Sequence, residues 1–338
     1  MPHTPTIPNP PRRRSKWVVR VAGVGLLLVI AAELFARFAL GLGDPPLYVL
    51  DPQIEYLLAP SQNCHRFGNT FRTNRFGMRS DDFPEQKSAP DELRVLVVGD
   101  SIINGGARVD QSDLATSVLQ RELAASLHRP VVVGNISAGS WGPVNQLAYI
   151  DRFGLFGADV VVLVLNTEDA ADVPGLEAIG PQWPRHKPLF ALQEIGERYF
   201  PRIFLPLGGN APPSPPPIAH TTSRAQDLTR TNEAVRAIVG HARATGAHVI
   251  VVRYATRPEV GQQGNDPTPD FARPDGAELA ETERIFRASL DRGENPFQPD
   301  GVHPNGLGQR LLGRLIANLM QHELQPENQT PADAKQGP

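Results

Sequence analysis

The sequence predicts an α/β protein built on a doubly wound parallel sheet between two layers of helices. From Glu92 onward, apolar strand-like runs alternate with amphipathic helical segments. The run from Val160 to Leu165 is unbroken, as a central parallel strand requires. Alternating strands and helices place a parallel sheet in the middle, with helices on both of its faces. We therefore expect three layers, preceded by an apolar helix near the N-terminus.

The composition is that of an ordinary enzyme. The chain has 338 residues, of which 40% are hydrophobic and 20% charged, enough for one large α/β domain with additional segments. The formal net charge of −3 does not indicate a nucleic-acid partner. Cys64 is the single cysteine, which excludes an intrachain disulfide and a cysteine-based metal site.

The N-terminus combines a basic tail, residues 1–16, with an apolar segment, residues 17–42. The uninterrupted centre of this segment, residues 21–32, is short for a spanning helix of about 20 residues. Spanning length requires Arg20 to snorkel and the turn of Glu33 and Arg37 to lie at the interface. We favour an uncleaved signal anchor over a cleaved signal peptide or a core helix. The protein would then be single-pass in the inner (cytoplasmic) membrane, its main domain periplasmic or extracytoplasmic.

The elements after the anchor follow in a regular order. Residues 43–90 are rich in turn formers and predict a small layer of strands and turns, with strand-like pieces at 47–50 and 70–74. The main domain occupies residues 91–325, and residues 326–338 form a tail that we expect to be disordered. Expected strands are 94–98, 131–134, 160–165 and 248–253, and expected helices are 114–127, 143–153, 223–245, 278–290 and 307–320.

An insertion rich in proline and aromatic residues, 171–219, interrupts the domain. A loop of this length inside a compact domain is usually functional or disordered. We expect its aromatic part to fold over the edge of the sheet and residues 212–217 to form a polyproline II tip. Stacking on sugar rings and simple anchoring of the insertion both remain open for its aromatic residues, Trp183, Phe190, Tyr199 and Phe200.

Three side chains from opposite ends of the domain have the chemistry of a serine esterase. Ser101 follows an apolar run, and Asp300 and His303 stand three residues apart near the C-terminus. A serine hydroxyl is a poor nucleophile near pH 7 unless an imidazole takes its proton and a carboxylate holds the imidazole. Ser101, Gly139 and Asn166 each come just after a predicted strand, at the edge where open parallel sheets form their sites.

These motifs resemble the sequence blocks of the SGNH, or GDSL, hydrolases. The stretch Gly-Asp-Ser-Ile around Ser101 resembles the first block, Asn-Ile-Ser-Ala-Gly ending at Gly139 resembles the second, and Asp-Gly-Val-His from Asp300 to His303 matches the last. Residues 74–79 resemble a segment of membrane-anchored bacterial members associated with exopolysaccharides.

The resemblance implies the flavodoxin-like SGNH fold and a role for each matching residue. Ser101 would be the nucleophile, His303 the general base and then acid, and Asp300 the residue that orients the imidazole. The backbone N–H groups of Ser101 and Gly139 would stabilise the oxyanion. No cofactor or metal is implied.

The third block departs from the family pattern Gly-x-Asn-Asp, because Glu168 stands where the asparagine donor is expected. An ionised glutamate cannot donate a hydrogen bond. Asn166 could donate instead, burial could keep Glu168 protonated, the hole could use two backbone donors, or catalysis could be lost. We favour Asn166 or the two-donor hole.

The expected function is removal of O-acyl groups, chiefly O-acetyl groups, from a carbohydrate or polysaccharide, with small esters as further substrates. Two alternatives remain: an O-acetyltransferase of an envelope polysaccharide, and a non-catalytic protein for glycan binding or assembly. Glu168 favours the last, whereas the intact Asp-x-x-His motif opposes it. The expected partners are the acylated substrate, the membrane through the N-terminal helix, and polysaccharide-assembly proteins.

Overall fold

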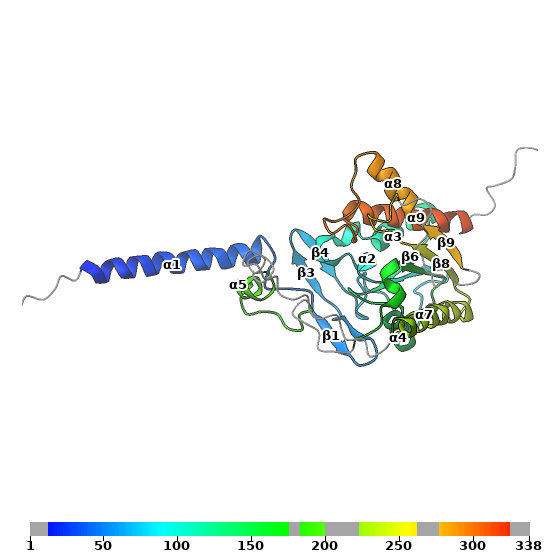
Figure 1. The fold of residues 1–338 in the computed structure, drawn as a ribbon, viewed down its shortest axis with the longest axis horizontal. Helices are drawn as coiled ribbons and strands as arrows, with labels where there is room; N and C mark the ends of the chain where they lie inside the picture. Colours follow the sequence, from blue (N-terminus) through cyan, green and yellow to red (C-terminus); the bar gives the residue numbers. More distant parts are fainter. Residues whose placement is uncertain (1–12, 176–182, 200–222, 262–276, 325–338) are drawn as a thin grey trace, which may run out of the picture.

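The computed structural model describes residues 13–175, 183–199, 223–261 and 277–324. A long helix, α1 (Arg13–Phe38), projects from an α/β body and meets it beside a short helix, α5 (Ala191–Glu194) (Figure 1). The proline-rich stretch 212–217, Phe200 and the tail 326–338 lie outside the described residues.

The body contains a five-stranded parallel sheet in the order β6-β5-β7-β8-β9. Because β5 lies between β6 and β7, the first two crossovers run in opposite directions and create a topological switch at the carboxyl ends of these strands. The predicted doubly wound fold is confirmed. The strands are β5 (Leu93–Gly99), β6 (Val131–Ser137), β7 (Val160–Leu165), β8 (His248–Arg253) and β9 (Glu278–Glu281).

Helices cover both faces of this sheet, because alternate side chains of each buried strand point to opposite sides. Leu96 and Leu163 belong to one core cluster, with residues of α4 and α7. Val97 and Val162 belong to the other, with residues of α3, α8 and α9. The helices are α3 (Ala115–Leu127), α4 (Pro143–Phe153), α7 (Arg224–Ala244), α8 (Glu283–Asp291) and α9 (Gly306–Leu324).

The sequence prediction of one helix over 278–290 is wrong at its start. Residues Glu278–Glu281 form the edge strand β9, which pairs in parallel with β8, and α8 begins only at Glu283. Glu-Leu-Ala-Glu consists of good helix formers. Ala280, however, is buried in the core cluster of the α3 face, and this packing outweighs the local preference.

Residues 43–90 form two antiparallel hairpins and the turns that follow them. β1 (Tyr48–Asp51) pairs with β2 (Glu55–Leu58), and β3 (Asn63–Arg66) pairs with β4 (Asn69–Arg72). The sequence analysis identified pieces near β1 and β4 but not β2 or β3. Tyr56 and Met78 are buried in the core cluster of the α4 face, so this layer shares the core of the main domain.

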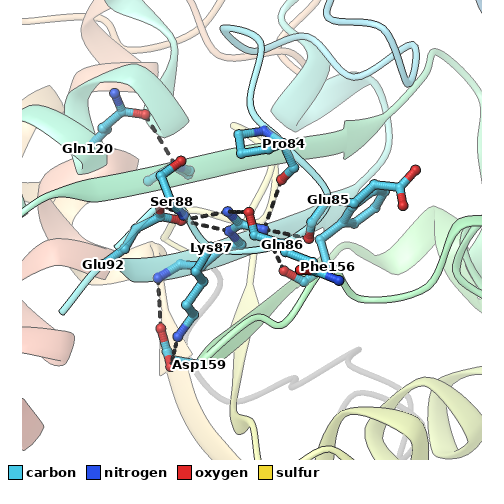
Figure 2. Close-up of polar contacts among 11 residues, drawn as sticks. Pro84, Glu85, Gln86, Lys87, Ser88, Glu92, Gln120, Phe156 and Asp159 are labelled. Atoms are coloured by element: carbon cyan, nitrogen blue, oxygen red, sulfur yellow. Dashed lines mark hydrogen bonds and ion pairs between the residues drawn. The ribbon is translucent and has the colours of Figure 1, made fainter. Parts of the chain in front are cut away.

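Buried Arg94 fixes the segment that leads into β5. Its guanidinium pairs with Glu92 and donates hydrogen bonds to backbone carbonyls, so the buried charge is fully solvated by the protein. Figure 2 shows the converging carbonyls, with Lys87 beside Asp159. The carbonyl oxygens of Pro84, Glu85 and Phe156 lie 3.0, 2.8 and 2.7 Å from the guanidinium.

The C-terminal end of α1 is docked on the insertion. The Glu33 carboxylate accepts hydrogen bonds from the N–H groups of Ala191 (2.8 Å) and Leu192 (3.0 Å). Leu42 is buried in a small apolar cluster together with Ala191. The predicted apolar segment 17–42 is therefore divided: the helix ends at Phe38, and Leu42 belongs to the body.

In residues 183–199, two aromatic rings of the insertion pack on the hairpin layer. The Trp183 ring packs 5.3 Å from that of Tyr56, and the Tyr199 ring packs 6.4 Å from that of Phe67. A buried ion pair between Arg66 and Glu194 holds this segment against β3. In this part of the insertion, anchoring is the observed role.

Short helical segments complete the described chain. They are α2 (Ser101–Asn104), η1 (Gly106–Arg108), η2 (Gln111–Asp113), η3 (Thr167–Ala171) and η4 (Ile195–Tyr199). Two of them, α2 and η3, begin at the carboxyl ends of β5 and β7, and this places them at the topological switch.

Candidate active site

Ser101 is the first residue of α2, immediately after the buried strand β5. Asp100 caps this helix, because its Oδ1 accepts a hydrogen bond from the N–H of Ile102 at 2.8 Å. A methyl group on Gly99 would lie 3.1 Å from the Ile103 side chain and 3.2 Å from the carbonyl oxygen of Val164. The tight strand-to-helix turn thus fixes Ser101 at the carboxyl edge of the sheet.

The structure brings Ser101, His303 and Asp300 together. His303 Nε2 lies 2.9 Å from Ser101 Oγ, and His303 Nδ1 lies 3.1 Å from Asp300 Oδ2. The tautomer with its proton on Nδ1 satisfies both contacts, donating to Asp300 and accepting from Ser101. In this arrangement the imidazole can receive the hydroxyl proton while the carboxylate stabilises the resulting imidazolium.

The turn that carries Asp300 and His303 is held from several sides. Gly301 has a φ of +72°, a conformation that favours glycine, and its carbonyl accepts from the N–H of Arg257 at 2.8 Å. The hydroxyl of Tyr254 donates to the carbonyl of Val302 at 2.8 Å. These contacts attach the turn to the segment that follows β8.

The Asp300 carboxylate remains ionised at neutral pH. Desolvation acts to raise its pKa, but hydrogen bonds from the N–H groups of His303 and Val302 and from the His303 ring outweigh it. The pKa of Asp300 therefore lies below its ordinary value. Both N–H groups lie 2.9 Å from Asp300 Oδ1, which leaves Oδ2 for the imidazole.

Backbone N–H groups of Ser101 and Gly139 are available as oxyanion donors. The first N–H of a helix has no intrahelical partner, and within the described residues neither N–H donates to another protein atom. A methyl group added to Gly139 would meet nothing within 4 Å, so space for a substrate oxygen adjoins this residue. The Tyr56 hydroxyl donates to the Gly139 carbonyl and thereby positions the loop after β6.

Asn166, not Glu168, lies at the centre of the third motif. Its side-chain Nδ2 donates to Asp100 Oδ2 at 2.9 Å, and its Oδ1 accepts from the N–H of Glu168 at 2.7 Å. One hydrogen of the amide group therefore remains free to donate. Glu168 is exposed, whereas one of the four interpretations required it to be buried.

Asn166 is hydrogen-bonded to two carboxyl groups, the buried Asp169 and the half-buried Asp100. Burial raises the pKa of Asp100 to about 6, although hydrogen bonds from Ile102 and Asn166 oppose the increase. Burial, followed by the charge of Asp100, raises the pKa of Asp172 to about 7 and that of Asp169 well above its ordinary value. Among the described residues, no group of three or more histidine, cysteine, aspartate or glutamate side chains is arranged to hold a metal ion.

Sequence reasoning missed the residues that support the site. Arg79 is fully buried and donates to the carbonyl of Asn104, the last residue of α2, and to those of Gly106 and Val109 just beyond it. Its guanidinium also lies 4.2 Å from the ring centroid of Phe71. Contacts to backbone carbonyls leave no spacing pattern in a sequence, although Arg79 does fall in the stretch 74–79 that resembles a family segment.

The site lies at the switch point of a doubly wound sheet and contains a serine, a histidine and an aspartate in hydrogen-bonding contact. This is the arrangement of a serine-type ester hydrolase. The chain belongs to the GDSL-like lipase/acylhydrolase family, whose family model matches residues 97–311. This membership places it among hydrolases that act on ester bonds. No curated protein matches the chain.

Several solved esterases resemble the chain in fold. A two-domain esterase (CEX) active on acetylated mannans, co-crystallised with mannopentaose, is 12% identical, with a TM-score of 0.43 over 73% of this chain and 53% of that chain. The acetyl xylan esterase AlAXEase is 14% identical, with a TM-score of 0.43 over 67% of this chain and 99% of that chain. The psychrotrophic esterase EstA from Pseudoalteromonas sp. is 14% identical, with a TM-score of 0.40 over 68% and 98%.

Proposed function

We propose that this chain is a membrane-anchored serine esterase that removes short O-acyl groups, chiefly O-acetyl groups, from a carbohydrate or polysaccharide. One observation carries the proposal: Ser101 Oγ, the His303 ring and the Asp300 carboxylate form a continuous hydrogen-bonded row in a chain of the GDSL-like lipase/acylhydrolase family.

In the first half of the reaction, His303 Nε2 takes the proton of Ser101 as Oγ attacks the ester carbonyl. The carbonyl oxygen becomes an oxyanion, stabilised by the N–H groups of Ser101 and Gly139 and by the free amide hydrogen of Asn166. His303 then gives its proton to the departing sugar oxygen, and the C–O bond breaks. Asp300 keeps the imidazole oriented and stabilises its charged form.

In the second half, water replaces the sugar. His303 removes a proton from the water as its oxygen attacks the acyl-enzyme carbonyl, and it returns that proton to Ser101 Oγ as the acyl–serine bond breaks. The products are a carboxylic acid, the deacylated alcohol and the original enzyme. The two N–H groups and Asn166 stabilise the second oxyanion in the same way.

The surroundings of Ser101 favour a hydrophilic substrate with a short acyl group. The side chains of His303 and Asp300 are 36% and 43% exposed, so the row opens directly to solvent. The residues that follow β7 at this edge are polar: Asn166, Thr167, Glu168 and Asp169. A sugar leaving group suits such a site better than a lipid does.

Anchoring through α1 supports a substrate in the cell envelope. The helix Lys16–Phe38 is long and apolar enough to cross a membrane, and a chain anchored by it would meet substrates near that membrane.

The first test compares hydrolysis of a small activated acetyl ester by the full chain and its variants. We expect Ser101→Ala and His303→Ala to lower kcat by roughly 10⁴-fold or more, because each removes a member of the catalytic unit. Ser88→Ala and His241→Ala are matched controls at exposed positions away from the site and should retain full turnover. Turnover that survives in both site variants would disprove the mechanism.

Glu168 is the observation that favours a second function, glycan binding without turnover. Its exposed side chain lies on the element that follows Asn166, where a negative charge would oppose an oxyanion. A folded wild-type chain that binds acetylated glycan but never hydrolyses an ester would support that function. Transfer of the acyl group to an added acceptor sugar, with little free acid formed, would instead identify an acetyltransferase.

A further inference from the structure

The end of α1 lies at the depth where a spanning helix would leave the hydrocarbon layer. At 1.5 Å per residue, about 20 residues cross a hydrocarbon core of about 30 Å. Counted from Lys16, the start of the apolar stretch, this length ends near Phe35. The turn from Glu33 to Phe38 would therefore lie at the boundary between the acyl chains and the headgroups.

A second segment, distant in sequence, lies at the same depth. Glu33 accepts hydrogen bonds from the N–H groups of Ala191 and Leu192, and the Arg37 guanidinium donates to the carbonyl of Leu189 at 3.2 Å. The backbone of 189–192 is thus attached to the very turn of α1 that would lie at the membrane boundary. Figure 1 shows α5 beside the base of α1.

The side chains of this segment are those that an interface requires. Leu189 and Phe190 are 81% and 60% exposed. Phe35 and Phe38, in the turn of α1 to which this segment is hydrogen-bonded, are exposed as well. Exposed apolar residues in a cluster mark a contact with a protein or a membrane. Continuity with the apolar surface of α1 favours the membrane.

Two basic side chains, Arg185 and Lys187, lie shortly before the apolar pair and are exposed. They line a hollow of about 310 Å³ whose other charged residues are Arg198, Glu194 and Glu197. Lys187 also pairs with Asp44 at 2.7 Å. Basic residues beside apolar ones that enter the interface suit anionic phospholipid headgroups.

We propose that residues 185–190 form a second membrane contact, in which Leu189 and Phe190 enter the interfacial layer of the bilayer and Arg185 and Lys187 face the lipid headgroups. This inference rests on the proposed anchoring of α1 and is independent of the ester chemistry. At this depth Glu33 is fully partnered, because its carboxylate pairs with Arg37 of the same helix and also accepts from two backbone N–H groups of the insertion.

Two attachments would make the body and the anchor one unit. Glu194, the last residue of α5, forms a buried ion pair with Arg66 of β3 and accepts from the N–H of Gly43 at 2.7 Å. The segment that touches the lipid is therefore joined both to α1 and to the hairpin layer. The body would rest on the membrane surface and would not swing on a flexible tether.

The test measures the depth of nitroxide labels on the full chain in nanodiscs of phosphatidylcholine and phosphatidylglycerol. Cys64 is the single cysteine and is buried, so a Cys64→Ala background allows one label at a time. Labels are placed at Leu189→Cys and Phe190→Cys. Val29→Cys reports on the anchor. The matched control is Leu279→Cys, an exposed apolar residue on the edge strand β9, which lies on the side of the body away from α1. Thermal unfolding checks that each labelled variant is folded.

The readout is a ratio for each label: its relaxation by oxygen, which concentrates in lipid, divided by its relaxation by a nickel chelate, which stays in water. We expect Leu189 and Phe190 labels to favour oxygen at least several-fold more than the Leu279 label, and less than the Val29 label. Labels at 189 and 190 that match Leu279, with Val29 in lipid, would disprove the second contact alone. A Val29 label in water would disprove the anchoring and the second contact together, and it would leave the esterase mechanism standing.

Discussion

Asn166 shows how a single residue can serve both the structure and the chemistry of this site. Its amide oxygen accepts from the Glu168 N–H at the start of η3, and its amide nitrogen holds the carboxylate beside the nucleophile, that of Asp100. The position of the side chain is therefore fixed before substrate arrives. A preorganised donor costs no rearrangement when the oxyanion forms.

We expect Asn166→Ala to lower kcat by roughly 10²–10³-fold with a small change in KM, as removal of one oxyanion donor does. Steady-state kinetics on a small acetyl ester measures the effect. Glu168→Gln, an isosteric change two residues away, is the control and should not lower kcat, because it only removes a negative charge near the oxyanion. An Asn166→Ala enzyme with unchanged kcat would favour a hole of two backbone donors.

The proposed nucleophile Ser101 and its proposed partners His303 and Asp300 could be chosen from sequence because each stands in a short motif. Asn166 was one of four possibilities, and only its contact with Asp100 distinguishes it. Tyr56 and Arg79 could not be found, because their partners are backbone carbonyls distant in the chain. Such contacts depend on the final packing, which no local pattern records.

Among the elements, η3 is unusual because two carboxyl groups with raised pKa values lie within it or directly after it. Asp169 belongs to this short helix and Asp172 directly follows it, and burial raises the pKa of both carboxyl groups. Asp169 still accepts a hydrogen bond from the N–H of Asn166 at 2.7 Å, so it completes the turn after β7. Stability and site geometry are coupled through this element.

The raised pKa values predict a loss of stability toward alkaline pH. Asp172 has a pKa of about 7 in the folded chain, against about 3.9 for an unperturbed aspartate. Between these values the folded state holds a proton that the unfolded chain has released, so the free energy of unfolding falls as pH rises from about 4 to 7. Groups with a lowered pKa, such as Asp110 at about 2, act in the opposite direction but at lower pH.

We therefore expect Tm to be higher at pH 5 than at pH 8, and Asp172→Asn to reduce the difference. Thermal unfolding followed by circular dichroism across this range measures it. Asp291→Asn, at an exposed position on α8, should leave the slope unchanged. A wild-type Tm that rises steadily from pH 5 to pH 8 would contradict the assignment.

Two strands of the parallel sheet were predictable because they contain apolar runs. β7 is apolar throughout and β8 is apolar between its terminal His248 and Arg253, and the bounds of both follow from sequence alone. The edge strand β9 was read as helix because Leu279 is exposed and only Ala280 is fully buried, so four residues carry almost no strand pattern. Its identity depends on pairing with β8, a contact between distant parts of the chain.

At the scale of the whole molecule, the hairpin layer of residues 43–90 supports the candidate active site. Tyr56 supports the loop of Gly139, and Arg79 supports the segment after Ser101. Burial lowers the pKa of Arg79 to about 9, so its guanidinium keeps its charge at neutral pH and solvates the three carbonyls. The catalytic body is therefore expected to need this layer for activity.

Arg79→Met tests that dependence. We expect the free energy of unfolding to fall by about 2–4 kcal/mol, because buried carbonyls lose their donors, and kcat to fall as the nucleophile helix loses its support. Arg79→Lys keeps the charge but not the planar fork and should give an intermediate loss. Arg75→Met, at an exposed arginine of the same segment, is the control, and denaturant unfolding with parallel kinetics is the measurement. Equal stability of both methionine variants would contradict the role of Arg79.

The distance along the chain between the nucleophile and its base has a consequence for biosynthesis. Ser101 and His303 are 202 residues apart. A ribosome that adds about 5–20 residues per second makes the serine roughly 10–40 s before the histidine. During that interval the hydroxyl has no base, so the nascent chain is inert toward esters in the compartment where it is made. Any truncation before residue 303 leaves the chain without the proposed base, so ester hydrolysis would report synthesis at least as far as His303.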